Sequence, residues 1–282
     1  MANETTTTQL SELLPSIVAE AMFQAQEQSI MRNLVKNYNL PLGNGKTITV
    51  PKWDAVSAAA LTEGTAVANT ALNTTSATLT VAEVGVMATI TDMARRTSAT
   101  NVIADAGMLM GRAIAKKMDQ DLMALFDGFS TSVGTDSAAL TAAKFYEAAA
   151  KLRANEVAGD EIYAVLHPHV AYDLKSNITS AFANSNANDL ANEALRTGYI
   201  GTIAGIQVFE NAAMANTGVA GDYKGAIFHK NALGLATLQD INIEVERDAA
   251  MRGDKLVATA VYGVGELFDN HGIEVLADSS IA

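Results

Sequence analysis

The longest run of regularly spaced apolar residues in the chain lies between Asn101 and Asp127. Its apolar side chains recur every three or four residues, which places them on one stripe of an α-helix, and the opposite side is charged. Asn101 is suited to cap the start of this helix and Gly128 to end it. A helix of this length is on the order of 40 Å long. We therefore predict a spine helix that lies across another layer with one face exposed.

The residues before position 43 predict an arm followed by a second helix. Residues 1–15 contain a run of four threonines and end at Pro15, which is typical of a flexible segment at a chain terminus. Apolar residues at helical spacing predict a helix from Ser16 to Tyr38. Pro41 would end it.

Residues 43–93 change to an alternating pattern. Thr47–Val50 and Thr78–Val81 alternate as strands, and Val84–Asp92 continues as a longer strand. The residues between the first two strands are small, polar and weakly periodic. A long loop of this kind is usually functional or disordered. The strands at its base favour a long hairpin that becomes ordered against a neighbouring subunit, and a disordered insertion is the alternative.

The rest of the chain predicts helices first and then mostly strands, which is an α+β order. The predicted elements are a linker at Phe129–Asp136, a helix at Thr141–Asn155, a buried strand at Ile162–Leu166, a short helix from Pro168 through Leu174, a surface excursion at Thr179–Glu193, and strands at Ile206–Phe209, Ala226–Phe228, Leu233–Leu238, Ile241–Glu246, Leu256–Tyr262 and Ile273–Leu276.

Composition excludes several classes of protein. The formal net charge is −12, which is opposite to the electrostatic footprint of a nucleic-acid binder. The chain has no cysteine, so disulfides and thiolate metal sites are excluded. No apolar run is long enough for a membrane span. No Lys or Arg precedes Arg32, so we expect no secretory signal peptide.

Several features together resemble one family. They are the arm, the long hairpin, the spine helix, the segment GYIGTIAGIQVFE at 198–210, and the run AIFHKNALGLATLQDINIEVERDAAMRGDKLVATAVYGVGEL at 226–267. Their order over nearly the whole chain resembles the major capsid proteins of tailed phages, which have the Hong Kong 97-type fold. The resemblance implies an N-terminal arm at 1–42, an extended loop at 43–93, a peripheral domain at 94–134 and 236–263 that contains the spine helix, and an axial domain at 135–235 and 264–282.

The resemblance also implies a function. It is that of a structural protein, not an enzyme, that self-assembles into pentamers and hexamers of an icosahedral phage head enclosing double-stranded DNA. Assembly would take place in the host cytoplasm, and the mature location would be the virion. Only about 40 residues precede the hairpin, fewer than a fused scaffolding segment needs. The expected partners are therefore further copies, a separate scaffolding protein, a portal, and optionally decoration proteins. An acidic surface would contact the packaged DNA only weakly.

Two alternatives to the phage capsid function remain. The first is an encapsulin-like nanocompartment shell, which shares the fold and encloses cargo enzymes. The second, from a different class, is a soluble metal-dependent hydrolase that uses His167, His169 and a carboxylate. Pro168 interrupts the strand between the two histidines and no third ligand follows nearby, so a strand-end and helix-start role is the better prediction. We predict no catalytic, cofactor-binding or metal-binding residue, and no cofactor.

Four other patterns have the residue types of functional sites. Some relatives join subunits through Lys–Asn isopeptide bonds, and Lys52 lies in the loop, but no pattern indicates its partner. The tripeptide Arg252-Gly253-Asp254 fits a turn between strands better than an adhesion motif. The glycines at 198, 201 and 205 do not match a dinucleotide-binding fingerprint. His229 and His271 are isolated and predict packed or surface residues.

Two groups of charges leave alternatives open. Glu244 and Glu246 would share one face of a strand, either as a solvated edge or meeting Arg247 or Arg252 of another subunit. On the spine helix, Arg112, Lys116 and Lys117 would touch DNA if that face lined a shell. The nearby carboxylates favour an ion-pairing face instead; they are Asp105, Asp119 and Asp121.

Overall fold

The computed structural model describes residues 4–5, 29–53 apart from 42 and 44, 71–98, 102–182 apart from 158, 202–216 and 221–281, with isolated positions between 54 and 70. The predicted start of the second helix and most of the predicted arm and surface excursion lie outside these residues. The described helices are α1 (Met31–Leu34), α2 (Asp92–Thr97), α3 (Val102–Met123), α4 (Ala142–Ala154) and α5 (Pro168–Phe182), with 3₁₀ segments η2 (Ala124–Gly128) and η3 (Asp269–His271). The described strands are β1 (Glu4–Thr5), β2 (Lys36–Asn39), β3 (Thr47–Trp53), β4 (Thr74–Thr80), β5 (Ala82–Thr91), β6 (Ser132–Thr135), β7 (Ile162–Leu166), β8 (Thr202–Ile203), β9 (Ile206–Glu210), β10 (Asp222–His229), β11 (Leu233–Asp248), β12 (Gly253–Glu266) and β13 (Gly272–Asp278).

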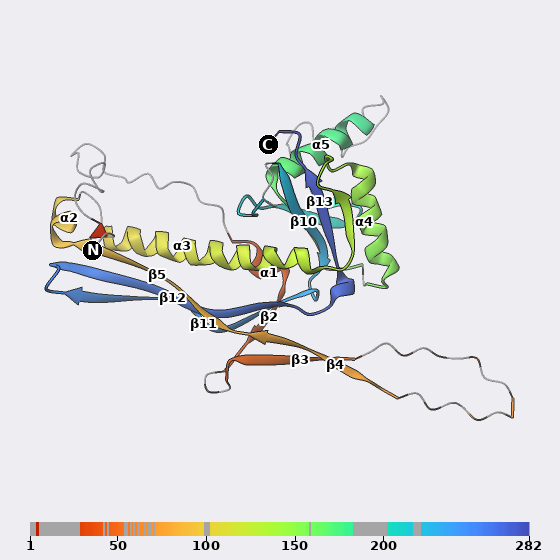
Figure 1. The fold of residues 1–282 in the computed structure, drawn as a ribbon, viewed down its shortest axis with the longest axis horizontal. Coiled ribbons are helices and arrows are strands. Elements are labelled where there is room, and N and C mark those ends of the chain that lie inside the picture. The colour runs from red at the N-terminus through yellow and green to blue at the C-terminus, as the bar shows by residue number, and fades with distance from the viewer. Residues whose placement is uncertain are drawn as a thin grey trace.

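The spine helix α3 lies along a long twisted sheet in the order β1-β5-β12-β11-β2 (Figure 1). Every second residue of β12 is buried toward the helix, from Leu256 to Tyr262, and packs with Met110, Ile114 and Met118 of α3. This alternation of buried and less buried residues is expected of a sheet with one covered face. The helix and sheet together form the elongated part of the molecule.

A more compact part is built on a six-stranded sheet in the order β6-β13-β10-β7-β9-β8. On one face, α4 and α5 cover the sheet with a core that includes Phe145, Leu152 and Ile227. On the other face, the next residue of β10, Phe228, belongs to the core of the elongated part, where its ring lies 5.5 Å from that of Phe126 in η2. Adjacent residues of β10 therefore join the two parts.

The hairpin β3–β4 extends away from both sheets (Figure 1). Its strands pair from Thr47 with Thr80 to Trp53 with Thr74. Its base packs in a third, smaller apolar cluster around Leu79. At this crossing β12 carries glycine, because a Cβ on Gly263 would lie 2.2 Å from the carbonyl oxygen of Thr80, which no side chain can accommodate. The absence of a side chain at Gly263 therefore allows the backbone of β4 to approach β12 closely.

Most of the predicted elements are present, with four corrections. Lys36–Asn39 is not the end of a helix but strand β2, because it pairs in parallel with Gly234–Thr237 of β11. Ser132–Thr135 is not linker but strand β6, which pairs with β13 and buries Val133. The two strands predicted at 233–238 and 241–246 are one strand with register shifts near 237–242. The helix that begins at Pro168 continues to Phe182, well past Leu174.

The predicted hairpin at 43–93 divides into two structures. Only β3 and β4 form the hairpin, whereas β5 leaves it and pairs with β12 in the long sheet. Helix α2, which follows β5, was not predicted. Among the described residues, no helix combines the length and the hydropathy needed to cross a membrane.

Candidate assembly surfaces

The β3–β4 hairpin has two different faces. Ile48 and Val50 point toward the body and pack on the apolar cluster at the hairpin base. The other face carries threonines paired across the strands, Thr47 with Thr80 and Thr49 with Thr78. Trp53, the only tryptophan of the chain, continues that outer face and is 70% exposed. An exposed large aromatic side chain on an extended element is typical of a contact with another molecule.

Lys52 holds the inner face of the hairpin to the body. Its ammonium group donates a hydrogen bond to the carbonyl of Leu267 and lies 5.2 Å from the centre of the Phe268 ring. The Phe268 ring in turn stacks on His271, with 4.8 Å between ring centres. The lysine is thus engaged within its own chain by a hydrogen bond and a cation–π contact.

The solvent-facing side of α3 is apolar near its start and basic further on. Met108 and Leu109 are exposed, and Arg112 and Lys116 follow along the same side. Neither of these two cations forms an ion pair with a described residue. Lys117 does pair with Asp121 one turn further on, at 2.5 Å. This side is therefore partly ion-paired and partly free.

Asp119 does not belong to that ion-pairing side, contrary to the prediction. Its carboxylate is 1% exposed and accepts hydrogen bonds from Ser29 Oγ at 2.7 Å, from the backbone N–H of Ile30 at 3.0 Å and from Asn211 Nδ2 at 3.2 Å. The three donors come from the segment before α1 and from the turn after β9. The sequence does not indicate this role, because both groups of donors are about ninety residues away along the chain.

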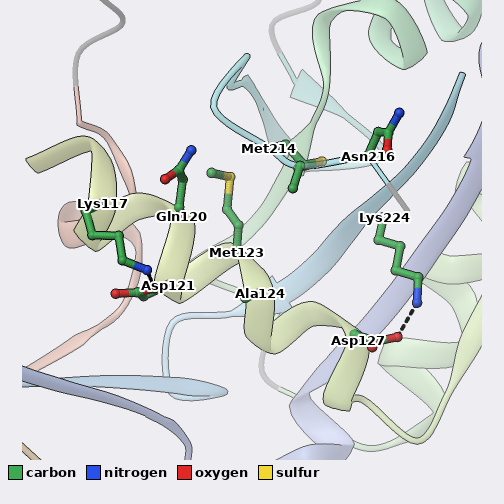
Figure 2. A pocket seen from close by; sticks show the side chains of 10 residues that line it. Lys117, Gln120, Asp121, Met123, Ala124, Asp127, Met214, Asn216 and Lys224 are labelled. Atoms are coloured by element: carbon green, nitrogen blue, oxygen red, sulfur yellow. Dashed lines mark hydrogen bonds and ion pairs between the residues drawn. The ribbon is translucent and has the colours of Figure 1, made fainter. Parts of the chain in front are cut away.

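A cavity of about 540 Å³ opens between the end of α3 and β10 (Figure 2). The pair Lys117–Asp121 lies on one side of it and the pair Lys224–Asp127 on the other, and Met123 and Met214 lie between them. The hydrogen bond from Lys224 to Asp127 raises the pKa of the lysine. Since each cation has its own carboxylate, the cavity carries no surplus charge that would favour an anionic ligand.

The far end of the long sheet is held by a network of ion pairs. Arg247 binds Asp92 through two hydrogen bonds of 2.6 Å and reaches Asp254 at 3.3 Å. Arg95 also binds Asp254, at 2.7 Å. These contacts lower the pKa of Asp92, chiefly through the hydrogen bond from Arg247. The network joins α2, β11 and β12 at the turn between the two long strands.

The tripeptide at 252–254 is part of this network. Asp254 is buried and engaged by two arginines, and a Cβ on Gly253 would lie 2.6 Å from the carbonyl oxygen of Ile90. The aspartate is therefore not presented to solvent, which an adhesion motif requires.

His167 and His169 lie together at the junction of β7 and α5. His167 Nδ1 accepts the backbone N–H of His169 at 3.3 Å and so caps the helix, in which Pro168 occupies the first position. The His167 ring stacks on Tyr223 with 3.7 Å between ring centres, and burial lowers its pKa to about 4. No group of three metal-ligating side chains that includes this pair occurs among the described residues.

Residues 74–271 match the family profile described as "Phage capsid protein". The match covers more than half of the chain. The chain belongs to this family of phage capsid proteins.

The fold of this capsid protein is similar to several solved capsid structures. It matches the capsid of cyanophage P-SCSP1u with 20% identity and a TM-score of 0.73, over 99% of this chain and 97% of that chain. The match to Mycobacterium phage Che8 has 20% identity and a TM-score of 0.74, over 93% and 96%. The match to the head structure of Helicobacter pylori bacteriophage KHP40 has 11% identity and a TM-score of 0.75, over 99% of both chains. No curated protein sequence is significantly similar.

These likenesses confirm the α+β, Hong Kong 97-type capsid fold that the sequence predicted, and they identify the capsid protein as a structural component of a phage head. The histidine pair at 167–169 has the strand-end and helix-start position that was expected. The residues of interest that the sequence did not indicate are Trp53 as an exposed end of the hairpin, Asp119 as a buried acceptor, and the network around Arg247.

Proposed function

We propose that this capsid protein self-assembles into pentamers and hexamers of an icosahedral head that encloses double-stranded DNA, and that it has no catalytic activity. The observation that carries the proposal is the hairpin. Its strand β3 ends at Trp53, and the side chains of Trp53, Val56 and Leu72 are all exposed. Exposed apolar groups on an extended element become stable when a second subunit covers them.

The domain division supports the same proposal. We assign the arm to residues 1–42, the extended loop to 43–93, the peripheral domain to 94–134 with 236–263, and the axial domain to 135–235 with 264–282. Strand β5 lies within residues 43–93, but we assign it to the peripheral domain because it pairs with β12. The axial domain would surround the five-fold and six-fold axes, since heterologous contacts close into rings there.

The partners in this proposal are further copies, a separate scaffolding protein, a portal and packaged DNA, with decoration proteins as an addition. Assembly would occur in the host cytoplasm. The acidic chain would bind DNA weakly, which suits a container from which DNA must leave. Closed shells of correct size from the protein expressed alone would contradict the need for a scaffold.

The test is negative-stain electron microscopy of the expressed protein together with analytical ultracentrifugation. Rings, sheets or shells of five-fold and six-fold units are the expected result. The matched variant replaces residues 54–73 with a short Gly–Ser turn that joins β3 to β4. We expect it to fold and to remain as small species. A wild-type protein that stays a monomer or dimer at every concentration, with co-expressed phage head proteins present, would overturn the proposal.

A further inference from the structure

His229 and His271 are isolated in the sequence, but the fold brings their rings together. His229 is the last residue of β10 and His271 the last of η3, and their ring centres are 5.8 Å apart. The His271 ring also stacks on Phe268, the ring over which Lys52 of the hairpin lies. The two histidines therefore lie next to the point where the hairpin is held to the body.

The hydrogen bonding of both rings suits only their neutral forms. His229 Nδ1 accepts the backbone N–H of Asn231 at 3.1 Å, and a protonated imidazole has no acceptor nitrogen. His271 Nδ1 is buried and has no hydrogen-bond partner among the described residues. A proton there would create a buried N–H without an acceptor, which costs free energy. Protonation of either ring therefore disturbs its surroundings.

A series of hydrogen bonds connects the histidines to the hairpin. The turn after His229 reaches Ala232, whose N–H is donated to the His229 carbonyl at 2.8 Å. The Ala232 carbonyl accepts the N–H groups of Leu267 at 2.7 Å and of Phe268 at 3.2 Å. The Leu267 carbonyl in turn accepts a hydrogen bond from Lys52. A disturbance of the turn at His229 therefore reaches both groups that hold the lysine.

The charges around His229 do not outweigh its burial. One carboxylate, that of Glu161, favours the charged form of the ring. This carboxylate is already ion-paired with Lys230 at 2.9 Å, and Lys36 of β2 also acts on it. Burial disfavours a proton on His229 more strongly than Glu161 favours it, and Lys230 disfavours it further, so the pKa of His229 is lowered.

The groups around His271 also disfavour its charged form. Asp269, in the same 3₁₀ segment, accepts hydrogen bonds from the N–H and the hydroxyl of Ser130. Burial raises the pKa of Glu266 at the end of β12, which disfavours its carboxylate. Lys52 is already a cation over the ring on which His271 stacks. Burial and the charge of the neighbouring imidazole lower the pKa of His271.

The contact between the end of the hairpin and the body is narrow. A cavity of about 420 Å³ is lined by Lys52 and Trp53 on the hairpin side and by Phe268 and His271 on the body side. The apolar cluster that holds the base of the hairpin is centred on other residues of the strands, around Leu79. Loss of the Lys52 contacts therefore frees the outer end of the hairpin without opening its base.

We propose that His229 and His271 form an acid-sensitive latch, which holds the outer end of the hairpin to the body while both rings are neutral and releases it when one is protonated. Because the pKa of each histidine is lowered from 6.5, the latch is closed above that pH and opens as the pH falls below it. The latch goes beyond the proposed function, and it acts within one chain.

Hydrogen exchange of the unassembled subunit tests the latch. Between about pH 7.5 and about pH 5, after correction for the intrinsic exchange rate, we expect the protection of the β3 and β4 amides to fall about fivefold, and that of β7 and α4 to stay constant. Trp53 gives a second signal, because it is the only tryptophan of the chain. Its fluorescence anisotropy should fall with the same midpoint as its segment becomes mobile.

The decisive variant carries His229→Asn and His271→Phe. The asparagine keeps an acceptor for the N–H of Asn231, and the phenylalanine keeps a ring on Phe268, but neither new side chain can be protonated. We expect this variant to retain the protection of β3 and β4 in acid. An equal fall in the wild type and in this variant would overturn the latch.

Lys52→Met provides an independent measurement. Since this variant lacks the contacts that the latch controls, its β3 and β4 amides should have low protection at both pH values and show no further fall in acid. His167→Gln is the control, because it removes a buried histidine in the compact part and should leave the acid response of the hairpin unchanged.

Three results would overturn the latch. They are a wild-type hairpin whose protection does not fall in acid, an acid response that Lys52→Met leaves intact, and an equal fall in β7 and α4, which would mean general unfolding. All these measurements use the unassembled subunit, so their outcome is distinct from that of the proposed function.

Discussion

In the six-stranded sheet, β7 and β10 bury nearly every residue, whereas in the β3–β4 hairpin alternate residues of both strands stay exposed. The first region has helices on one face and the core of the elongated part on the other, so its strands are complete within one chain. The hairpin has a cluster at its base and nothing from its own chain over its outer face among the described residues. One region is therefore complete within a single chain, and we propose that the other is completed by assembly.

The largest effect should separate the two regions. Phe145 is completely buried in the core beneath α4. We expect Phe145→Ala to lower the free energy of unfolding of the subunit by about 3–5 kcal/mol, because it leaves a cavity. Trp53→Ala, on the exposed end of the hairpin, should change that free energy by less than about 0.5 kcal/mol. Denaturant titration of the unassembled subunit measures both.

The yield of shells should depend on Trp53, although the stability of the subunit does not. Trp53→Ala should reduce the yield of shells while the subunit remains fully folded. A Trp53→Ala protein that assembles as well as wild type would show that the hairpin end is not a subunit contact.

Acid should weaken the compact region through His167. The pKa of His167 is lowered by burial to about 4 in the folded protein, against 6.5 for an exposed histidine. The unfolded chain therefore takes up the proton first, and stability is lost as pH falls from 6.5 toward 4, by up to about 3 kcal/mol. His167→Gln should reduce this pH slope, which denaturant titrations at several pH values measure. Identical slopes in both proteins would contradict the assignment.

Asp119 offers a smaller effect at the connection between regions. Asp119→Ala leaves three donors without an acceptor, so we expect a loss of about 2–3 kcal/mol in the free energy of unfolding. Asp127→Ala is the matched control, because its carboxylate is exposed, and it should cost less than about 1 kcal/mol. Equal losses in the two variants would mean that the buried hydrogen bonds of Asp119 stabilise the fold no more than the exposed carboxylate of Asp127 does.

The smallest effect should be confined to the hairpin. Lys52→Met keeps the aliphatic stem but removes the hydrogen bond to Leu267 and the cation–π contact with Phe268. We expect about 1 kcal/mol less protection of the β3 and β4 amides in hydrogen exchange. The six-stranded sheet should be unaffected. Lys46→Met, at an exposed position in the turn before β3, provides the comparison.

Regular patterns explain how much of this was predictable. The spine helix, α4, β7 and β12 were predicted because each buries one face or both within the chain, and burial leaves a period in the sequence. Lys36–Asn39 has no such period, and it is a strand only because β11 lies beside it. Propensity alone cannot supply that neighbour.

The candidate surfaces were less predictable than the fold. That Glu244 and Glu246 share a face follows from strand alternation. Whether Arg247 is already ion-paired does not, because its partner Asp92 lies 155 residues away along the chain. Asp119 was predicted to be a surface charge because its donors, too, lie far away along the chain. A carboxylate that follows two lysines by two and three residues predicts an ion pair, and only the folded chain shows the distant donors around it.

The missing side chain at Gly263 has a geometric consequence for the whole particle. It allows β4 to cross β12 at backbone distance, and the hairpin leaves the body from that crossing. Seven residues of strand span about 23 Å, so a change of about 10° at the crossing would move the far end by about 4 Å. If the hairpin contacts a neighbouring subunit as we propose, the single hydrogen atom at position 263 helps to fix the spacing between subunits, and through it the radius of the shell they form.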